Sequence, residues 1–301
     1  MTVCLFQPII IAAIEFVKQE AAAALQPRIY DCHTHTHFSH DSACDPQDTL
    51  RAARAKGLAG FAVTDHCEIE LCQDTDVAAP ILQSVACARK LGAQVLAGIE
   101  LGESIWHSRQ AADVVCAADF DLVLGSVHSV RYRDYTMPYS GINFSAFSPK
   151  ELDAYLGAYF DDLLEMIGTI DFDILAHLTC PLRYLCGKYG ITVHLRAYAE
   201  QIDTVLKEII GRNIALEVNT SCLGTGYDAL MPDLPILRRY RELGGALITL
   251  GSDAHTAQRV AHGFDRALES LSALGFAHIY YYRHRKPIAQ KLDNIEGGNS
   301  L

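Results

Sequence analysis

The sequence predicts an α/β fold in which parallel strands close into a barrel around a metal site. Seven apolar runs each finish in a histidine, aspartate or glutamate, and helix-like segments lie between most of them. This alternation is typical of βα units that build a parallel sheet. One large barrel also fits the length of 301 residues, half of which are hydrophobic. Because such barrels keep their chemistry at the carboxyl ends of the strands, we expect the metal site at that rim.

Each predicted strand ends at a polar side chain that can bind a metal. The seven runs are Tyr30–His35, Gly60–His66, Val95–Glu100, Leu122–His128, Phe172–His177, Ile214–Glu217 and Ala246–His255. The predicted helices are Pro46–Lys56, Ala78–Leu91, Pro149–Ile167, Leu195–Arg212, Pro232–Leu243 and Phe264–Leu274. Start and stop signals support several helices, such as Ser148 and Pro149 before one and Gly57 after another. We expect a last apolar run, Ala277–Tyr282, to add an edge strand, and the residues after Arg283 to form a loose tail.

The chain is expected to have a helical N-terminal extension, residues 1–27, followed by a single barrel domain, residues 28–301. An amphipathic helix over Pro8–Leu25 is expected to cover the bottom of the barrel. A targeting segment is the less favoured alternative, because no lysine or arginine precedes the apolar stretch and Glu15 interrupts it. The stretch is also too short to span a bilayer.

The longest irregular stretch, residues 129–148, follows the strand that ends at His128 and should therefore hang over the rim. It contains three tyrosines, two phenylalanines and two arginines. Structureless loops of this length are usually functional. We expect this insertion to act as a lid that encloses a small substrate, and the alternative is a disordered surface loop.

Composition and charge exclude several classes of partner. The formal net charge is −11, and no basic stripe of the kind that binds nucleic acid is present. A small anionic substrate remains compatible with this charge, because bound divalent cations reverse the local field. The ten cysteines are scattered without a CxxC pair, which favours reduced thiols and a cytoplasmic location. No membrane partner is expected, and the sequence leaves the oligomeric state open.

Imidazoles and carboxylates dominate the strand ends. His33 and His35 are two residues apart on a strand and therefore face the same way. Such a pair is a weak signal alone, but its position at the end of a buried strand strengthens it. A carboxylate such as Glu100 can bridge two cations. The whole set offers more ligands than one ion uses, and its chemistry favours Zn, Mn or Fe over Ca or Mg.

The order and spacing of these motifs resemble those of the PHP (polymerase and histidinol phosphatase) family. The matching motifs are His33-x-His35 with Ser39 and Asp41, Thr64-Asp65-His66, Gly98-Ile99-Glu100, Ser126-Val127-His128, Ala176-His177 and Gly251-Ser252-Asp253-Ala254-His255. They extend over residues 30–276. The resemblance implies a distorted (β/α)7 barrel with a trinuclear site. The segment after His128 and the run Ala176–Tyr184 are similar to those of the stand-alone histidinol-phosphatases within the family.

The resemblance also implies a role for each strand-end residue around three divalent transition-metal ions. The first ion would be held by His33, His35, Glu100 and Asp253. Glu100 would bridge to a second ion, which is held by His128 and His177. The third ion would be held by His66, His255 and the loop residue Asp41, with His40 as the alternative. Asp65 is better placed to orient an imidazole than to bind an ion.

The expected reaction is hydrolysis of L-histidinol phosphate to L-histidinol and phosphate in histidine biosynthesis. A hydroxide held between metals would attack phosphorus, with Glu100, Asp253 and His255 as the catalytic residues. Either Asp253 or a bound water would give a proton to the leaving group. The main alternative is a PHP phosphoesterase that acts on nucleotides or other small phosphomonoesters. Less favoured are a non-catalytic PHP module and an amidohydrolase, which usually has a bridging lysine that the predicted strand ends lack.

Substrate contacts are assigned from position, and the family resemblance favours phosphate binding by Arg183. Arg183 follows His177 by six residues and could hold a phosphate bidentately, whereas the alternative is a surface arginine on the next helix. The candidates for binding the imidazole and ammonium groups of histidinol are Glu103, His107, Tyr132, Asp134 and Tyr135.

Overall fold

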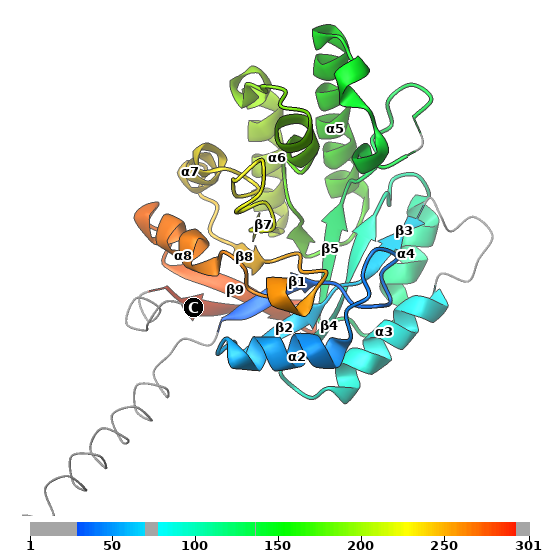
Figure 1. Cartoon of the computed structure of the whole chain (residues 1–301), viewed down its shortest axis with the longest axis vertical. Helices are drawn as coiled ribbons and strands as arrows, with labels where there is room; N and C mark the ends of the chain where they lie inside the picture. The colour runs from blue at the N-terminus through cyan, green and yellow to red at the C-terminus, as the bar shows by residue number, and fades with distance from the viewer. Residues whose placement is uncertain (1–28, 70–77, 136, 293–301) are drawn as a thin grey trace, which may run out of the picture.

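The computed structural model describes residues 29–69, 78–135 and 137–292. In this part of the chain the predicted α/β barrel is confirmed, with parallel strands in the order β1-β2-β4-β5-β6-β7-β8 (Figure 1). The strands are β1 (Tyr30–Thr34), β2 (Gly60–Val63), β4 (Val95–Gly102), β5 (Leu122–Ser126), β6 (Ile174–Leu175), β7 (Ala215–Asn219) and β8 (Ile248–Gly251). A short strand, β3 (His66–Glu68), pairs with the last residues of β4.

The first and last strands of the sheet nearly close the barrel. The Asp253 backbone N–H donates to the His33 carbonyl at 2.8 Å, and the His35 N–H donates to the Ala254 carbonyl at 2.9 Å. A parallel bridge joins Thr34 to Ala254. These contacts lie at the end of β1 and just past the end of β8, so the closure itself brings the predicted ligands of these two strands together.

Helices surround the sheet (Figure 1). They are α2 (Pro46–Ala55), α3 (Ala78–Lys90), α4 (Ser108–Cys116), α5 (Pro149–Thr169), α6 (Ala199–Arg212), α7 (Leu234–Glu242) and α8 (Phe264–Ala273). Short turns of other helix types are η2 (Tyr139–Gly141), η3 (Phe144–Ala146), the π-helix η4 (Arg183–Lys188), η5 (Leu195–Tyr198) and η6 (Ala257–Arg259). None of the described helices is long and apolar enough to cross a membrane.

Most predicted helices are present, and local capping explains where they begin. A capping box between Ser148 and Glu151 starts α5. The predicted helix from Pro232 begins two residues later, because the Asp233 side chain accepts from the Ile236 N–H at 3.1 Å and caps α7 there. Helix α4 was not predicted.

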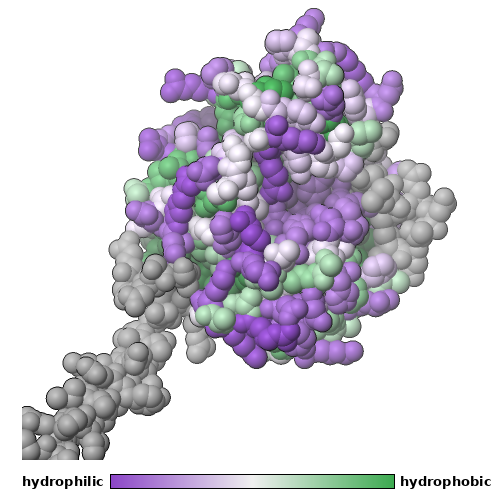
Figure 2. Space-filling view, in the orientation of Figure 1, coloured by the Kyte–Doolittle hydropathy of each residue, from purple (hydrophilic) through white to green (hydrophobic). Residues whose placement is uncertain are grey.

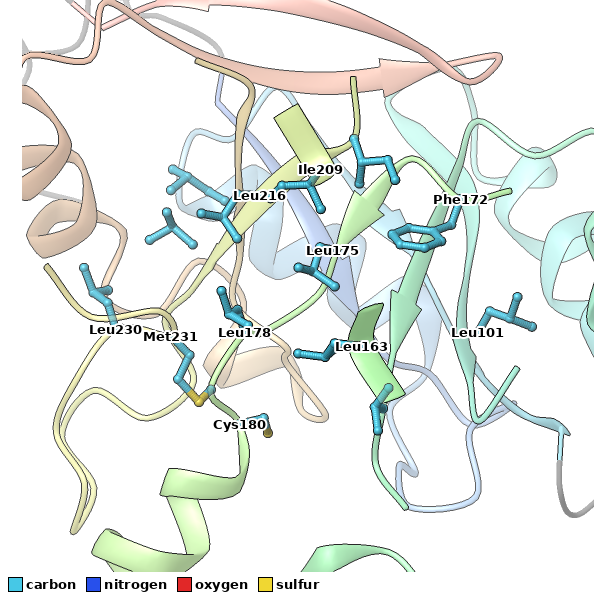
Figure 3. Packing of buried hydrophobic residues seen from close by; sticks show 14 of the residues in the cluster. Leu101, Leu163, Phe172, Leu175, Leu178, Cys180, Ile209, Leu216, Leu230 and Met231 are labelled. Carbon is cyan, nitrogen blue, oxygen red and sulfur yellow. The ribbon is translucent and has the colours of Figure 1, made fainter. Parts of the chain in front are cut away.

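Two apolar layers form the core. The larger layer fills the space between the strands and the helices. Figure 3 shows part of it, where Leu163 of α5 and Ile209 of α6 lie near Leu175 of β6 and Leu216 of β7. The smaller layer fills the barrel itself with residues such as Cys32, Ala62, Leu96, Leu124 and Ile174. The barrel is therefore a packed core, and chemistry is confined to its rim.

The prediction of a loose tail after Arg283 is wrong. Strand β9 (His278–Arg283) turns into β10 (Lys286–Lys291), and the two form an antiparallel hairpin with its own two-stranded sheet. Among the described residues β9 therefore does not extend the barrel sheet as an edge strand. Its Tyr281 ring stacks on Tyr30 of β1 at 4.0 Å, and Tyr282 enters the inner apolar layer. The hairpin thus covers the bottom of the barrel, whereas the predicted helix Pro8–Leu25 lies outside the described residues.

The predicted lid, residues 129–148, is folded against the core in the part that the structure describes. Its side chains Tyr139, Ile142 and Phe144 are buried. The Tyr139 N–H donates to the carbonyl of His128 at 2.9 Å, which holds η2 beside the end of β5. The insertion therefore has a fixed position next to the rim, and its action as a lid stays a prediction. The eight cysteines in the described part of the chain are free thiols.

Candidate metal centre

Glu100 of β4 lies at the centre of the rim, fully buried among five imidazoles. One of its carboxylate oxygens, Oε2, is 3.3 Å from His33 Nε2, 3.5 Å from His35 Nε2 and 2.9 Å from His66 Nδ1. The other oxygen, Oε1, contacts Nε2 of two further imidazoles, at 2.7 Å and 3.3 Å; these are His177 and His128. A carboxylate with imidazoles on both oxygens has the geometry expected of a bridge between ions.

Asp253 follows β8 and closes the other side of the cluster. Its Oδ1 atom is 3.3 Å from His35 Nε2 and 3.6 Å from His255 Nδ1. Asp253 has a φ of 51°, a left-handed backbone conformation that is uncommon for aspartate. Gly251, two residues earlier, is required by close packing, since a Cβ there would lie 2.7 Å from the Cβ of His33. Unusual backbone is thus concentrated where the ligands converge.

The loop after β1 contributes Asp41. Its Oδ2 atom lies 3.1 Å from His255 Nε2 and 3.6 Å from His66 Nε2. Burial alone would raise the pKa of Asp41, but its contacts with these two imidazoles lower it below the usual value. His40, the alternative loop ligand, stacks obliquely on His66 with ring centroids 5.2 Å apart. Asp41 is therefore the better placed of the two candidates.

The donor atoms fit divalent transition metals. Imidazole nitrogens face one another at short range, with His33 Nε2 3.0 Å from His35 Nε2 and His128 Nε2 3.3 Å from His177 Nε2. Among the described residues, Glu100 Oε2 is buried without a hydrogen-bond partner. Four groups of three side chains have donor atoms within 4.8 Å of one another. Facing lone pairs on nitrogen and oxygen, with no thiolate among them, are what Zn, Mn or Fe would bind.

A second layer of side chains orients these ligands. Glu217 of β7 contacts His33 Nδ1 at 2.7 Å, so that ring presents Nε2 to the cluster. His35 Nδ1 contacts the Ser39 hydroxyl at 3.0 Å, and that hydroxyl donates to Asp65 Oδ1 at 2.8 Å. Asp65 therefore acts on a ligand imidazole through Ser39, and Glu217 lies behind the cluster rather than within it.

The electrostatics of the cluster depend on pairing between imidazoles and carboxylates. Burial alone would lower the pKa of His33, His66 and His128, but neighbouring carboxylates raise all three well above the usual value. Burial would raise the pKa of Glu100, yet the surrounding imidazoles hold it well below its usual range. For His35, burial and the neighbouring His66 lower the pKa to about 3. Without ions, the site therefore holds protons on several of its imidazoles.

Two connected hollows open at the rim. A cavity of about 220 Å³ is lined by cluster residues, by Cys180 and by Tyr139 of the predicted lid. A wider groove of about 470 Å³ shares Arg183, Tyr184, Asp253 and His255 with this cavity and extends to Lys188 and Arg259. Figure 2 shows a hydrophilic hollow near the middle of this view.

Arg183 stands at the boundary between the two hollows. It begins the π-helix η4, a helix type often found at functional sites. Its Nη2 atom donates to Asp253 Oδ2 at 3.0 Å and also to the Ser221 hydroxyl. The side chain is 29% exposed, so it remains accessible to a ligand in either hollow. The structure therefore brings Arg183 to the cluster, as expected.

Three predicted substrate contacts do not line the cavity at the cluster. Glu103 is buried, and its carboxylate accepts from the backbone N–H groups of His128 and Ser129. Tyr132 is buried in the apolar core. His107 lines a separate surface pocket. Glu103 lies in the turn after β4 and has a φ of 48°, a left-handed backbone conformation.

One cluster residue was missed. Glu68 on β3 is buried and lines the cavity, with its Oε1 atom 3.0 Å from Nδ1 of both His66 and His128. The spacing His66-x-Glu68 repeats the alternation of the first His-x-His pair, and this signal was available in the sequence.

Comparison with known proteins agrees with this geometry. A model of the PHP domain matches residues 31–221, which is more than half of the chain. The chain belongs to the PHP family. The probable histidinol-phosphatase of Clostridium acetobutylicum is 30% identical over 80% of this chain and 92% of that protein. The histidinol-phosphatase of Lactococcus lactis is 25% identical over 82% of this chain and 91% of that protein.

Solved structures confirm the PHP fold. The crystal structure of histidinol phosphate phosphatase from Lactococcus lactis, complexed with zinc, L-histidinol and phosphate, aligns with a TM-score of 0.73 and 22% identity. The alignment covers 87% of this chain and 99% of that one. The putative histidinol phosphatase of Listeria monocytogenes aligns over 79% of this chain with a TM-score of 0.63 and 16% identity.

Proposed function

We propose that this PHP protein is a metal-dependent phosphomonoesterase that hydrolyses L-histidinol phosphate to L-histidinol and phosphate in histidine biosynthesis. The observation that carries the proposal is the convergence of imidazoles and carboxylates on Glu100, with Arg183 at the edge of the same cavity. Support for the substrate comes from the names of the relatives and from the ligands of the Lactococcus lactis structure.

We further propose that the cluster holds three divalent ions. The first position has the donors of His33, His35, Glu100 and Asp253, and the second those of Glu100, His128 and His177. The third has those of His66, His255 and Asp41. The short distances among these side chains support the grouping. Zinc is favoured, since the structure from Lactococcus lactis contains it and the donors suit it.

Bound ions of this kind activate water and neutralise charge that develops on a transferring phosphoryl group. The protein's own groups then position the substrate. Arg183 has a planar guanidinium that can donate two hydrogen bonds to phosphate oxygens, and Asp253 holds it at the cluster. Tyr139 and Tyr184 line the cavity beside it.

Asp253 is ionised in this environment. Burial would raise its pKa, but His35, His33 and Arg183 hold the pKa well below its usual range. A carboxylate without a proton orients ligands and cannot protonate the leaving alkoxide. A water molecule in the cavity is therefore favoured over Asp253 as the proton source for the leaving group.

A second candidate substrate class is supported by the wider groove. It lies next to the cluster, and Lys188 and Arg259 give it positive charge. A small phosphomonoester whose bulky leaving group keeps a second anionic group, such as a nucleotide with a second phosphate, would suit this groove better than the cationic histidinol does.

An assay on three substrates tests the proposal. Purified protein is given histidinol phosphate, a nucleoside monophosphate and an aryl phosphate, each with and without a chelator. We expect the highest kcat/KM for histidinol phosphate and loss of all three activities with chelator. Comparable rates on all three substrates would contradict the assignment to histidinol phosphate, and full activity in the chelator would contradict metal dependence.

A further inference from the structure

Glu68 connects two imidazoles that are assigned to different ions. Its Oε1 atom is 3.0 Å from Nδ1 of His128 and 3.0 Å from Nδ1 of His66. His128 presents its other nitrogen, Nε2, to Glu100 at 3.3 Å. His66 presents Nε2 to Asp41 at 3.6 Å, and its Nδ1 also lies 2.9 Å from Glu100. One buried carboxylate thus lies behind the second and the third proposed metal positions.

The neighbouring strand is shaped to accept this carboxylate. In the pairing of β3 with β4, Glu68 lies opposite Gly102. A Cβ atom on Gly102 would lie 1.8 Å from Glu68 Oε2, which is closer than atoms can approach. The absence of a side chain at Gly102 therefore lets Glu68 lie against the backbone of β4 and reach both imidazoles.

Two carboxyl groups contact His128, one at its backbone and one at its ring. Glu103 accepts hydrogen bonds from the backbone N–H groups of His128 and Ser129, the latter at 2.5 Å. Glu103 also forms a hydrogen bond with Glu68, which in turn contacts the His128 ring. The two carboxyl groups therefore fix both the backbone and the side chain of one proposed ligand.

We propose that Glu68 is a positioning residue that couples the second and third metal positions. By accepting from Nδ1–H of His128 it fixes the tautomer in which that ring offers Nε2 to an ion and increases the basicity of that nitrogen. For His66 the same carboxylate oxygen lies 3.0 Å from Nδ1 and favours the same orientation. Glu68, His66 and His128 also have donor atoms within 4.8 Å of one another, so the number of bound ions separates this role from direct metal binding. The proposal rests on the metal cluster of the proposed function and not on the identity of the substrate.

Two variants and a matched control test this role. Glu68→Gln keeps the size of the side chain and removes its charge. Gly102→Ala keeps the carboxylate but displaces it from β4 by the added methyl group. Glu165→Gln removes a carboxylate on the outer face of α5, where the side chain is 47% exposed, and serves as the control. Thermal unfolding of the metal-free proteins verifies that each variant folds.

The measurements are zinc content by elemental analysis at saturating zinc and zinc affinity by competition with a chromogenic chelator. We expect the two variants at Glu68 and Gly102 to bind as many ions as the unaltered protein at saturation. At least one ion should be held about 10–100-fold more weakly, as is typical when a carboxylate behind a metal ligand is lost. The ion at His33, His35 and Asp253 should keep its affinity, and the control should match the unaltered protein throughout.

Three results would overturn the proposal. Unchanged affinity in Glu68→Gln would show that the carboxylate does not support the ligands. Loss of one ion at saturating zinc would make Glu68 itself a ligand. Weakening in Glu68→Gln with unchanged affinity in Gly102→Ala would show that the position of the carboxylate is unimportant. Because each readout is metal binding, failure of the histidinol phosphate assignment would leave these results unaffected.

Discussion

Buried carboxylates have different partners at the two ends of the barrel. At the bottom, Asp121 accepts from the Arg89 guanidinium at 2.5 Å and from two backbone N–H groups. Asp173 likewise accepts from Arg285 Nε at 2.9 Å and from the Val123 N–H at 2.8 Å. Each carboxylate there is satisfied by the chain itself.

At the rim, by contrast, Glu100 faces five imidazoles, and one of its oxygens has no hydrogen-bond partner among the described residues. Burying polar groups that the chain does not satisfy costs free energy, so such an arrangement indicates groups reserved for a ligand. The bottom of the barrel is therefore built for stability and the rim for ion binding. A change at the bottom should lower stability alone, whereas a change at the rim should lower activity.

The largest effect is expected from Glu100→Gln. This change removes the charge that faces all five imidazoles, so phosphatase activity should fall on the order of 10³-fold and zinc content should decrease. The metal-free variant should unfold at a lower temperature than the unaltered metal-free protein, because His33, His66 and His128 lose the buried carboxylate that pairs with them. Steady-state kinetics and calorimetry give both values. A variant that keeps its zinc and its kcat would contradict the bridging role.

Arg183→Ala should have a smaller effect, confined to substrate binding. Loss of hydrogen bonds from a guanidinium to phosphate should raise KM for the phosphorylated substrate by about 10–100-fold. Zinc content should not change, since the assigned ligands remain in place. The matched control is Arg266→Ala, whose side chain is 55% exposed and pairs with Asp228. An unaltered KM in Arg183→Ala would exclude contact with the phosphate.

Metal uptake should release protons and should weaken at low pH. In the metal-free protein the pKa values of His33, His66 and His128 are raised, so these imidazoles hold protons at neutral pH that an ion must displace. Zinc affinity should therefore increase with pH, by about tenfold per pH unit for each proton displaced. Calorimetric titration with zinc in two buffers of different ionisation enthalpy counts the protons. Zinc uptake without proton release would contradict the pairing of protonated imidazoles with carboxylates at the rim.

The smallest effect on activity is expected at the bottom of the barrel. Arg285→Ala leaves the buried carboxylate of Asp173 without its guanidinium and should lower the free energy of unfolding by about 1–3 kcal/mol. The value of kcat should stay unchanged, because the hairpin lies at the opposite end from the cluster. Chemical denaturation and an activity assay measure the two quantities. A loss of kcat without a loss of stability would contradict the conclusion that the bottom of the barrel serves stability and the rim serves activity.

The barrel and most ligand positions could be predicted because they depend on strand ends. Parallel strands place their carboxyl termini at one edge, so His33, Glu100 and His177 converge although they are far apart in sequence. The spacing of apolar residues does not predict where side chains point in the loops that follow the strands. The left-handed backbone at Glu103 turns its side chain under His128, which position in the sequence alone did not predict.

Two further features were missed for related reasons. Strand β3 has only three residues, so the His66-x-Glu68 alternation is a short signal and Glu68 was not identified. Strand β10 is mostly exposed and lysine-rich, and its pairing with β9 makes it a strand despite its polar character. The helix at Pro8–Leu25, the cytoplasmic location and the lid action of residues 129–148 stay predictions.

The most direct test of the account is the metal content of freshly isolated protein, measured together with its activity in EDTA. We predict close to three equivalents of transition metal per chain and phosphatase activity that is lost in EDTA and returns with zinc. Protein that contains no transition metal and keeps full activity in EDTA would contradict the central claim that the rim of this barrel is built to hold ions.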